Sequence, residues 1–331
     1  MPSITVVIAA RPGQAEVQAV AASRRLSYPA DQLDIIVARG RQPSVQRNAA
    51  MKAARGDLIY FLDDDSLPQS DNLSRAAARF SDPRVMMVGG PNLCPAEAPS
   101  LEQVFARVLA SWLAFGPSRA RYTPIGKARE SSEKELILCN LMARRGAILE
   151  LGGFNEALYP NEENALMDEL QKRGGKLIYD PQFIVHRRPR SSLRSFARML
   201  MTYGRGRAEQ FRLHPTLGST LNFAPPLFLF YLAALAPGLL VGRLAELPVA
   251  GCFLLAPLPL YAFILLVQTL MLAGSGKILP SIAAAPLIVL AHLLYGWGFW
   301  RGLFTKLDPP GLRKPVEVAI ERVSLHADGI C

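Results

Sequence analysis

The stretch "GDLIYFLDDDS", residues 56–66, carries the fold prediction. Residues 58–62 form a short uninterrupted apolar run, which is typical of a buried parallel strand. Three aspartates follow it directly: Asp63, Asp64 and Asp65. Adjacent carboxylates repel one another, and burial raises the cost of their charge. The cluster therefore predicts a partner of opposite charge at the end of this strand.

Strands and helices alternate on both sides of this run. Such spacing is typical of a doubly wound, Rossmann-like α/β domain with a mostly parallel sheet. Ligands of these folds bind beyond the carboxyl ends of the strands, which is where the aspartates stand. We expect strands at residues 4–9, 33–37, 57–62, 85–88, 176–179 and 183–186, and helices at 14–26, 44–54 (with Ser44 as N-cap), 72–80 and 161–173.

Three long segments without Asp, Glu, Lys or Arg follow: Leu213–Gly242, Leu247–Gly276 and Ile278–Trp300. About 20 apolar residues suffice to cross the hydrocarbon core of a bilayer. Buried core helices of a soluble protein are the alternative, but three such segments in succession favour a membrane. The sequence thus predicts a first domain over 1–212, a membrane region over 213–304 with about three hydrophobic segments, and a C-terminal tail over 305–331.

The net charge of +10 could suggest nucleic acid, but the distribution of the charge favours a membrane. Eight arginines crowd residues 187–212 against a single acid, Glu209, just before the first apolar segment. Juxtamembrane arginines favour the cytoplasmic side and anionic lipid. We expect a basic interfacial helix at 190–212 and no nucleic-acid partner; a solvated basic helix face is the alternative.

The chain starts with a strand-like run, residues 3–8, rather than with a basic segment and a long apolar one, so no secretory signal is indicated. Four separated cysteines form no C-x-x-C pair, and neither a disulfide framework nor a zinc site is expected. Both features predict a cytoplasmic first domain. Three spans would place the basic residues after Trp300 on the far side, so a re-entrant or interfacial segment stays an alternative.

Asp63 and Asp65 are two residues apart and can reach the same cation. Hard carboxylate oxygens suit Mg²⁺ or Mn²⁺. Such an ion neutralises the charge that develops on a departing nucleoside diphosphate. The alternative is an acidic cluster that only caps a turn.

Several further motifs accompany this one between residues 4 and 212. They are "SYP" (27–29), "RN" (47–48), residues 56–66, "LCNLMARRGAILELGGFNE" (138–156), "NEENALMDELQKRGGKLIYDP" (161–181) and "IVHRRPR" (184–190). Together they resemble the family 2 glycosyltransferases, and with the apolar C-terminal segments they are most similar to the membrane-bound enzymes that build bacterial exopolysaccharides such as succinoglycan. The ending "HLLYGWGFWRGL", residues 292–303, is similar to the last membrane segment of that group.

This resemblance implies a GT-A fold and a nucleotide-diphosphate sugar as donor. Asp65 would hold the Mg²⁺ or Mn²⁺, with Asp63 near the ribose or the diphosphate and His186 completing the metal shell. Arg187 or Arg188 could instead meet phosphate. The implied donor-binding residues are Ala9, Arg11, Arg39, Arg47, Asn48, Asp63 and Asp64.

The resemblance also implies the catalytic acids, Glu162 and Glu163. Most family members carry Asp at the second position, so Glu163 is a departure that keeps the carboxylate. Glu163 would act as general base on the acceptor hydroxyl, and in-line attack would invert the anomeric configuration. Two acids that merely favour the helix dipole are the alternative. Gly153, Phe154 and Asn140 would lie on the acceptor side.

A second departure concerns the nucleotide. Family members usually carry an Asp after the second strand, where this chain has Val37-Ala38-Arg39-Gly40-Arg41, so the nucleotide stays open. The membrane segments imply a lipid-linked acceptor and a multi-pass protein of the bacterial inner membrane. Two alternatives remain: a processive polysaccharide synthase, although its Q-x-x-R-W motif is absent, and a catalytically silent membrane scaffold.

Overall fold

The computed structural model describes residues 1–156, 161–213, 215, 217–244, 248–274, 276–306 and 316–325. The chain divides into two compact units. Residues 1–95, 117–188 and 308–331 form the first unit, and residues 96–116 and 189–307 form the second. These limits differ from the predicted division, because the basic helix belongs to the second unit and a strand of the C-terminal tail belongs to the first.

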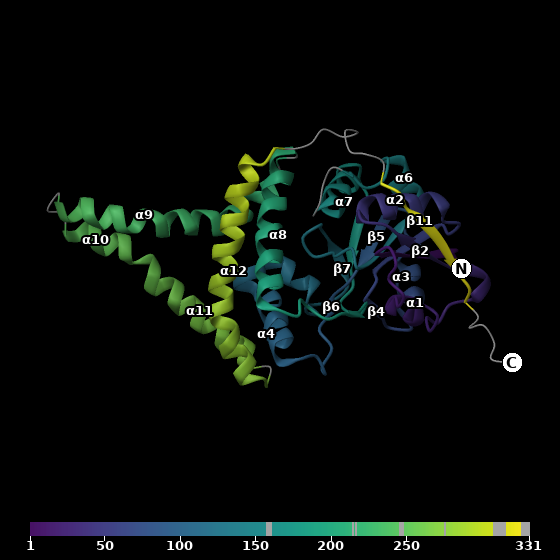
Figure 1. The fold of residues 1–331 in the computed structure, drawn as a ribbon, viewed down its shortest axis with the longest axis horizontal. Helices are drawn as coiled ribbons and strands as arrows, with labels where there is room; N and C mark the ends of the chain where they lie inside the picture. Colours follow the sequence, from purple (N-terminus) through teal and green to yellow (C-terminus); the bar gives the residue numbers. More distant parts are fainter. Residues whose placement is uncertain are drawn as a thin grey trace. The chain divides into compact units, whose positions relative to one another are not determined.

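The first unit is built on one large sheet (Figure 1). In the described part of the chain this sheet has eight strands, in the order β11-β2-β1-β3-β8-β5-β9-β7. Strands β2, β1, β3, β5 and β9 run in one direction, and β11, β8 and β7 run in the other. The strands are β1 (Ile4–Ala10), β2 (Leu33–Arg39), β3 (Leu58–Asp63), β5 (Val85–Gly89), β7 (Arg129–Ser131), β8 (Asn140–Arg144), β9 (Lys176–Tyr179) and β11 (Ala319–Val323).

Helices cover both faces of this sheet, which is why its central strands β1 and β3 are apolar at nearly every position. Successive residues of a strand point to opposite faces. In β1, Val6 therefore enters one buried cluster and Val7 the other. Helices α1 (Gln18–Ser23) and α3 (Asn72–Arg79) pack on the first cluster, and α2 (Pro43–Ala53), α6 (Arg145–Glu150) and α7 (Glu162–Lys172) pack on the second.

Local capping differs from the prediction at α2. Pro43 occupies the first turn, and Ser44 lies inside the helix with a buried hydroxyl that has no hydrogen-bond partner among the residues described above. Proline suits the first helical position because its missing N–H would be unpaired there in any case. Ser44 is therefore not the N-cap.

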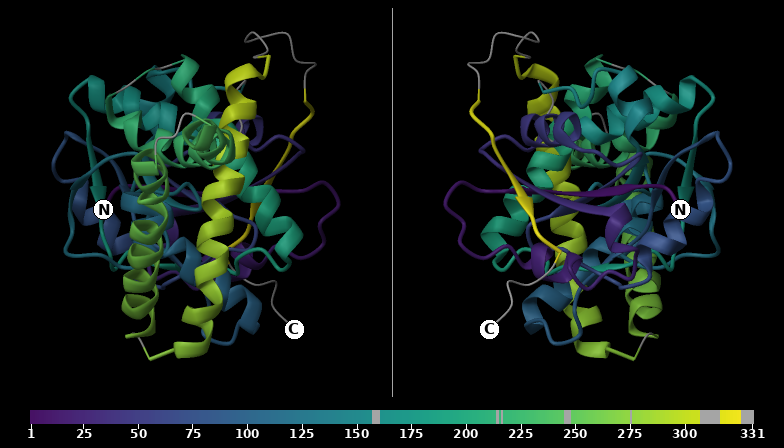
Figure 2. Two further views of the ribbon diagram at one scale, coloured as in Figure 1. Left: turned by 90° about the vertical axis from the view of Figure 1, so that its left-hand side faces the viewer. Right: turned by 90° about the vertical axis from the view of Figure 1, so that its right-hand side faces the viewer.

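Strand β11 from the C-terminal tail closes one edge of the sheet, antiparallel to β2 (Figure 2). Two ion pairs reinforce the strand pairing, Arg39 with Glu321 and Arg322 with Asp34. An uncovered edge strand offers unpaired backbone groups to other chains, so this strand also protects the edge.

A small three-stranded sheet in the same unit follows the aspartate turn directly. It contains β4 (Leu67–Pro68), β6 (Asn92–Leu93) and β10 (Val185–His186), with β10 in the middle. The antiparallel register places His186 opposite Leu67. Consequently, the residue after β10 emerges beside the turn that holds Asp65.

The second unit contains the basic helix α8 (Leu193–Leu213), which packs along α12 (Ile278–Phe304). Glycines allow the close approach: a Cβ on Gly204 would lie 2.0 Å from the Tyr295 carbonyl oxygen, and one on Gly298 would lie 2.0 Å from that of Met201. The stacked rings of Phe105 and Phe196 join α4 (Ser100–Leu109) to α8.

In the described part of this unit, three helices are long and apolar enough to cross a membrane: Thr220–Arg243, Gly251–Ala273 and Ile278–Phe304. Most side chains of the first two face outward, including Phe230 and Phe263. Helix α9 (Ala224–Leu244) continues through Pro237, whereas the second segment is interrupted at Ala256 between α10 (Pro248–Leu255) and α11 (Pro257–Ala273). Helices α11 and α12 are in contact and converge toward the end at which the chain passes from one to the other (Figure 1).

Candidate active site

The aspartate turn lies at the carboxyl end of β3, as predicted. Asp63 is the last residue of β3 and pairs in register with Ala9 of β1. Ser66 holds the turn: its hydroxyl accepts from the Asp63 N–H and donates to the Cys139 carbonyl oxygen. The Asp64 carbonyl oxygen accepts from the N–H of Ala19, at the start of α1. The turn is thus anchored to three elements.

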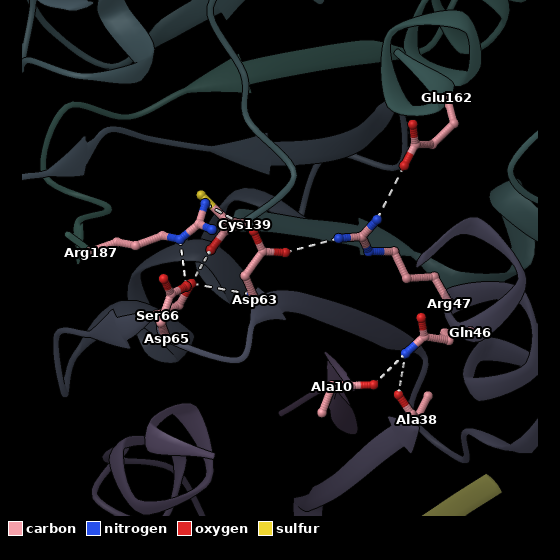
Figure 3. Close-up of polar contacts among 10 residues, drawn as sticks. All are labelled: Ala10, Ala38, Gln46, Arg47, Asp63, Asp65, Ser66, Cys139, Glu162 and Arg187. Atoms are coloured by element: carbon pink, nitrogen blue, oxygen red, sulfur yellow. Dashed lines mark hydrogen bonds and ion pairs between the residues drawn. The ribbon is translucent and has the colours of Figure 1, made fainter. Parts of the chain in front are cut away.

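Arg187 lies between the two outer aspartates (Figure 3). Its Nη1 is 3.0 Å from Asp63 Oδ2, and its Nε donates to Asp65 Oδ1. The small sheet delivers it there, because its N–H donates to the Leu93 carbonyl oxygen directly after β10. Burial raises the pKa of Asp65, and Arg187 opposes that rise. One guanidinium therefore serves as the cation that the triple aspartate requires.

Arg47 links the aspartate turn to the start of α7 (Figure 3). Its Nη2 is 2.9 Å from Asp63 Oδ1, and its Nη1 is 3.2 Å from Glu162 Oε1. The side chains of Arg47 and Glu162 are only 8% and 4% exposed, so little water screens this pair. Arg47 is a residue of α2. It joins the aspartate turn and the acidic pair that begins α7, which the sequence suggested as separate motifs, in one network of ion pairs.

Glu162 and Glu163 open α7 with different surroundings. The preceding Asn161 has φ 96°, which Asn tolerates better than most residues. Burial raises the pKa of Glu162 to about 7, the charge of Glu163 adds to this, and Arg47 opposes it. Glu163 is only partly buried. The first acid is therefore enclosed by its ion pair, and the second is the more accessible one.

Asn48, next to Arg47, clamps the turn that contains Gly153 and Phe154. Its Oδ1 accepts from the Phe154 N–H at 2.8 Å, and its Nδ2 donates to the Phe154 carbonyl oxygen at 2.9 Å. The Nδ2 also donates to Glu156 Oε1 at 2.8 Å. The predicted donor-side Asn48 and the predicted acceptor-side turn are thus in direct contact.

The clamp predicts unequal effects of alanine at two neighbouring glycines. Gly152 and Gly153 have φ of 82° and 88°, so either substitution should cost about 1–2 kcal/mol of stability. A Cβ on Gly153 would also lie 2.5 Å from Asn48 Oδ1, whereas one on Gly152 would meet nothing within 4 Å. Gly153→Ala should therefore lower the denaturation midpoint clearly more than Gly152→Ala. Equal midpoints for the two variants would contradict the clamp.

Asn140 lies in the core of the first unit instead of facing a cavity. Its Oδ1 accepts from the Tyr60 hydroxyl at 2.8 Å, and its Nδ2 donates to the Phe183 carbonyl oxygen at 2.6 Å. Asn72 donates to the same hydroxyl and to the Ile184 carbonyl oxygen. These hydrogen bonds fix residues 183 and 184, which lead into β10, so Asn140 helps to position Arg187 without contacting a ligand.

The remaining predicted donor-side residues lie around the ends of β1 and β2. Gln46 joins these ends by donating to the carbonyl oxygens of Ala10 and Ala38 (Figure 3). Arg39 donates to the Gln14 carbonyl oxygen and pairs with Glu321 of β11. Arg11 is exposed just beyond β1. The last residue of β2, Arg39, is thus an arginine that is already bound by the C-terminal strand.

Asp63 and Asp65 have the ligand chemistry that a divalent cation prefers, because their carboxylate oxygens are hard donors and both bind the same cationic group, the Arg187 guanidinium. Magnesium sites of this kind use one or two carboxylates and complete the shell with substrate phosphates. Among the residues that the structure describes, no three His, Cys, Asp or Glu side chains gather as a metal-binding group. His186 is therefore not brought together with Asp63 and Asp65; its neighbour Arg187 takes that place.

Two contributions were not expected from the sequence. Arg187 was considered for phosphate alone, and its ion pairs with the aspartates depend on the register of the two-residue strand β10, which is too short to recognise by periodicity. Strand β11 was included in a tail; the alternation "VEVAIERV", residues 316–323, is the signal that could have identified it.

A search of solved structures finds the same fold class. The mannosyltransferase PcManGT from Pyrobaculum calidifontis, in complex with GDP-Man and Mn²⁺, superposes with a TM-score of 0.53 at 17% identity, over 92% of this chain and 87% of that one. Residues 1–349 of TarS from S. aureus, in complex with UDP, give a TM-score of 0.43 at 10% identity, over 76% and 90% of the chains. The superposition on the mannosyltransferase shows that the fold is of the GT-A glycosyltransferase type.

Sequence comparison identifies the family. Residues 1–202 match the family described as glycosyltransferase like family 2, and the chain belongs to this family. The pre-mycofactocin glycosyltransferases of two Mycobacterium tuberculosis strains are each 29% identical over 211 residues. That alignment covers 63% of this chain and 43% of those relatives, so the chain spans less than half of their length.

Proposed function

We propose that this protein transfers a single sugar, with inversion, from a nucleoside-diphosphate sugar to a lipid-linked acceptor at the bacterial inner membrane. The observation that carries the proposal is the series of ion pairs Arg187–Asp63–Arg47–Glu162, which joins the aspartate turn to the start of α7. The aspartates proposed to hold the donor and the glutamates proposed to act on the acceptor are thereby parts of one site. A relative that is named a glycosyltransferase and a structural neighbour in complex with GDP-Man support this assignment.

The donor is proposed to bind with its diphosphate at the aspartate turn. A Mg²⁺ or Mn²⁺ ion held by Asp63 and Asp65 would neutralise the charge of the leaving diphosphate. Asp63 is fixed on one side by Arg47, which keeps one of its oxygens from the diphosphate and limits repulsion. Ala9, in register with Asp63, offers a small side chain where a ligand approaches the strand ends.

Glu163 is the proposed general base. Glu162 is buried and bound to Arg47, so the more accessible Glu163 is the carboxylate that an acceptor hydroxyl can reach. It would take the proton as the hydroxyl oxygen attacks the anomeric carbon opposite the leaving diphosphate, which inverts the configuration. The pair Arg47–Glu162 would position the start of α7 for this step.

A lipid-linked acceptor is proposed because the chain combines this site with three helices apolar enough to cross a membrane. A nucleotide sugar is water-soluble, so the apolar partner should be the acceptor. Arginines of α8 before the first of these helices favour the cytoplasmic face, where the proposed donor is available.

The test is transfer from a panel of radiolabelled nucleotide sugars into organic-extractable lipid, by the purified full chain in membrane lipid, with Mn²⁺, with Mg²⁺ or with a chelator. Label should enter the lipid phase as a single sugar from at least one donor, and Asp65→Asn should abolish it. Label in long polymer would identify a processive synthase instead. Absence of transfer from every donor, in lipids from a bacterial inner membrane, would contradict the proposal.

A further inference from the structure

We propose that Arg187 is a built-in competitor of the divalent cation: it occupies the position between Asp63 and Asp65, and a metal ion binds there only by displacing it. The inference builds on the proposed donor site, and it assigns to Arg187 a role beyond a phosphate contact. It follows from which oxygens the guanidinium uses.

The contacts leave little room for a second cation. Asp63 Oδ1 is bound by Arg47 and Asp63 Oδ2 by Arg187, so both oxygens are in ion pairs. Asp65 Oδ1 is bound by the same Arg187 through Nε. Two like charges at contact distance repel strongly in a partly buried site. A metal ion that bridges the two aspartates must therefore replace the guanidinium.

The surroundings keep Arg187 in this position. The hydrogen bond from its N–H to Leu93 and the strand pairing of His186 fix its backbone. Its side chain is 22% exposed, so Arg187 is not fully enclosed by protein. Arginine stays protonated in proteins, so Arg187 is a cation in contact with Asp63 and Asp65. Its backbone can stay in place while the side chain is displaced.

The consequence is a weak affinity for the metal alone. Each carboxylate offered to the ion must first lose its bond to Arg187, and this loss is subtracted from the binding free energy. Neutral glutamine at position 187 removes the competition and leaves both carboxylates available. Lysine has a single ammonium group, which cannot reproduce the Nε and Nη1 contacts with two carboxylates, so its effect should be intermediate.

The experiment is titration of the detergent-solubilised full chain with Mn²⁺ alone, in which electron paramagnetic resonance measures the free aqueous ion. Arg187→Gln should lower the Kd for Mn²⁺ by about tenfold or more, within the usual range of coupled binding. Arg187→Lys should fall between this variant and the parent. Arg173→Gln removes an equal charge from an exposed ion pair at the end of α7 and should leave the Kd unchanged.

A double variant tests whether the gain in Mn²⁺ affinity depends on the aspartates. Adding Asp65→Asn to Arg187→Gln should remove the gain. An unchanged or higher Kd for Arg187→Gln, or an equal gain for Arg173→Gln, would overturn the inference. Should Arg187→Gln fail to fold, as judged by circular dichroism, Arg187→Lys decides by the same criterion. The titration uses no sugar donor, so failure of the transfer assay would leave its result standing, and the reverse also holds.

Discussion

Glu163→Gln should lower the transfer rate by about 10²–10⁴-fold, which is the usual contribution of a general base. Glutamine keeps the size of the side chain and removes the group that accepts the proton. Because Glu163 is partly buried and forms no ion pair within the described part of the chain, its replacement should leave the fold intact. The measurement is the initial rate of sugar transfer at saturating donor, with circular dichroism to check folding.

A control variant lies on the same helix. Glu169→Gln removes a carboxylate whose side chain is 45% exposed and which pairs with Arg173 on the helix surface, and it should keep nearly the parent rate. Glu162→Gln should have a smaller effect on rate than Glu163→Gln, because Glu162 faces Arg47. A larger loss with Glu162→Gln would mean that the base is assigned to the wrong acid.

Arg47→Met should destabilise the protein by about 3 kcal/mol at pH 8 and abolish most of the transfer activity. Removing one partner of a buried ion pair leaves the other charge without compensation. Arg47 supports two acids, Asp63 and Glu162, so both would lose a partner together. Lys52→Met, which replaces an exposed cation of the same helix, should change stability little.

The pH dependence of this loss identifies the acid. Burial raises the pKa of Glu162 from 4.5 to about 7 in the folded chain, so its contribution to stability is present at low pH and is lost as the pH rises through about 7. At pH 5 Glu162 is protonated and needs no cation, and Arg47→Met should cost less there than at pH 8. Denaturant titrations of parent and variant at both pH values measure the difference. A loss that is equal at both pH values would contradict the Arg47–Glu162 pair.

Much of the first unit could be predicted because its strands bury both faces. The runs that become β1, β2, β3 and β9 are mostly apolar and short, and each lies within two residues of its predicted limits. Strands of a parallel sheet that is covered on both faces form continuous apolar runs, so their limits can be read from the sequence. The aspartates at the end of β3 then followed from the general position of ligands in such folds.

The contacts within the site could not be predicted in the same way. Arg47 was expected to bind donor, but its choice of Asp63 and Glu162 depends on how α2 and α7 pack on one face of the sheet. Asn140 appeared to be an acceptor contact because it lies in a family motif, and the structure gives it core partners instead. Tertiary packing and strand register, which no local pattern encodes, decide both cases.

The central claim is that Asp65 binds the donor and Glu163 acts as general base within one site. Titration calorimetry of the donor in the presence of Mn²⁺ tests this claim most directly. The donor is the nucleotide sugar identified by the transfer assay, and the proteins are Asp65→Asn and Glu163→Gln. Asp65→Asn should weaken donor binding by tenfold or more, as expected for a lost charged contact of about 1.4 kcal/mol. Glu163→Gln should bind the donor as the parent does while transferring almost no sugar. Unchanged binding in Asp65→Asn, or equal weakening in both variants, would contradict the claim.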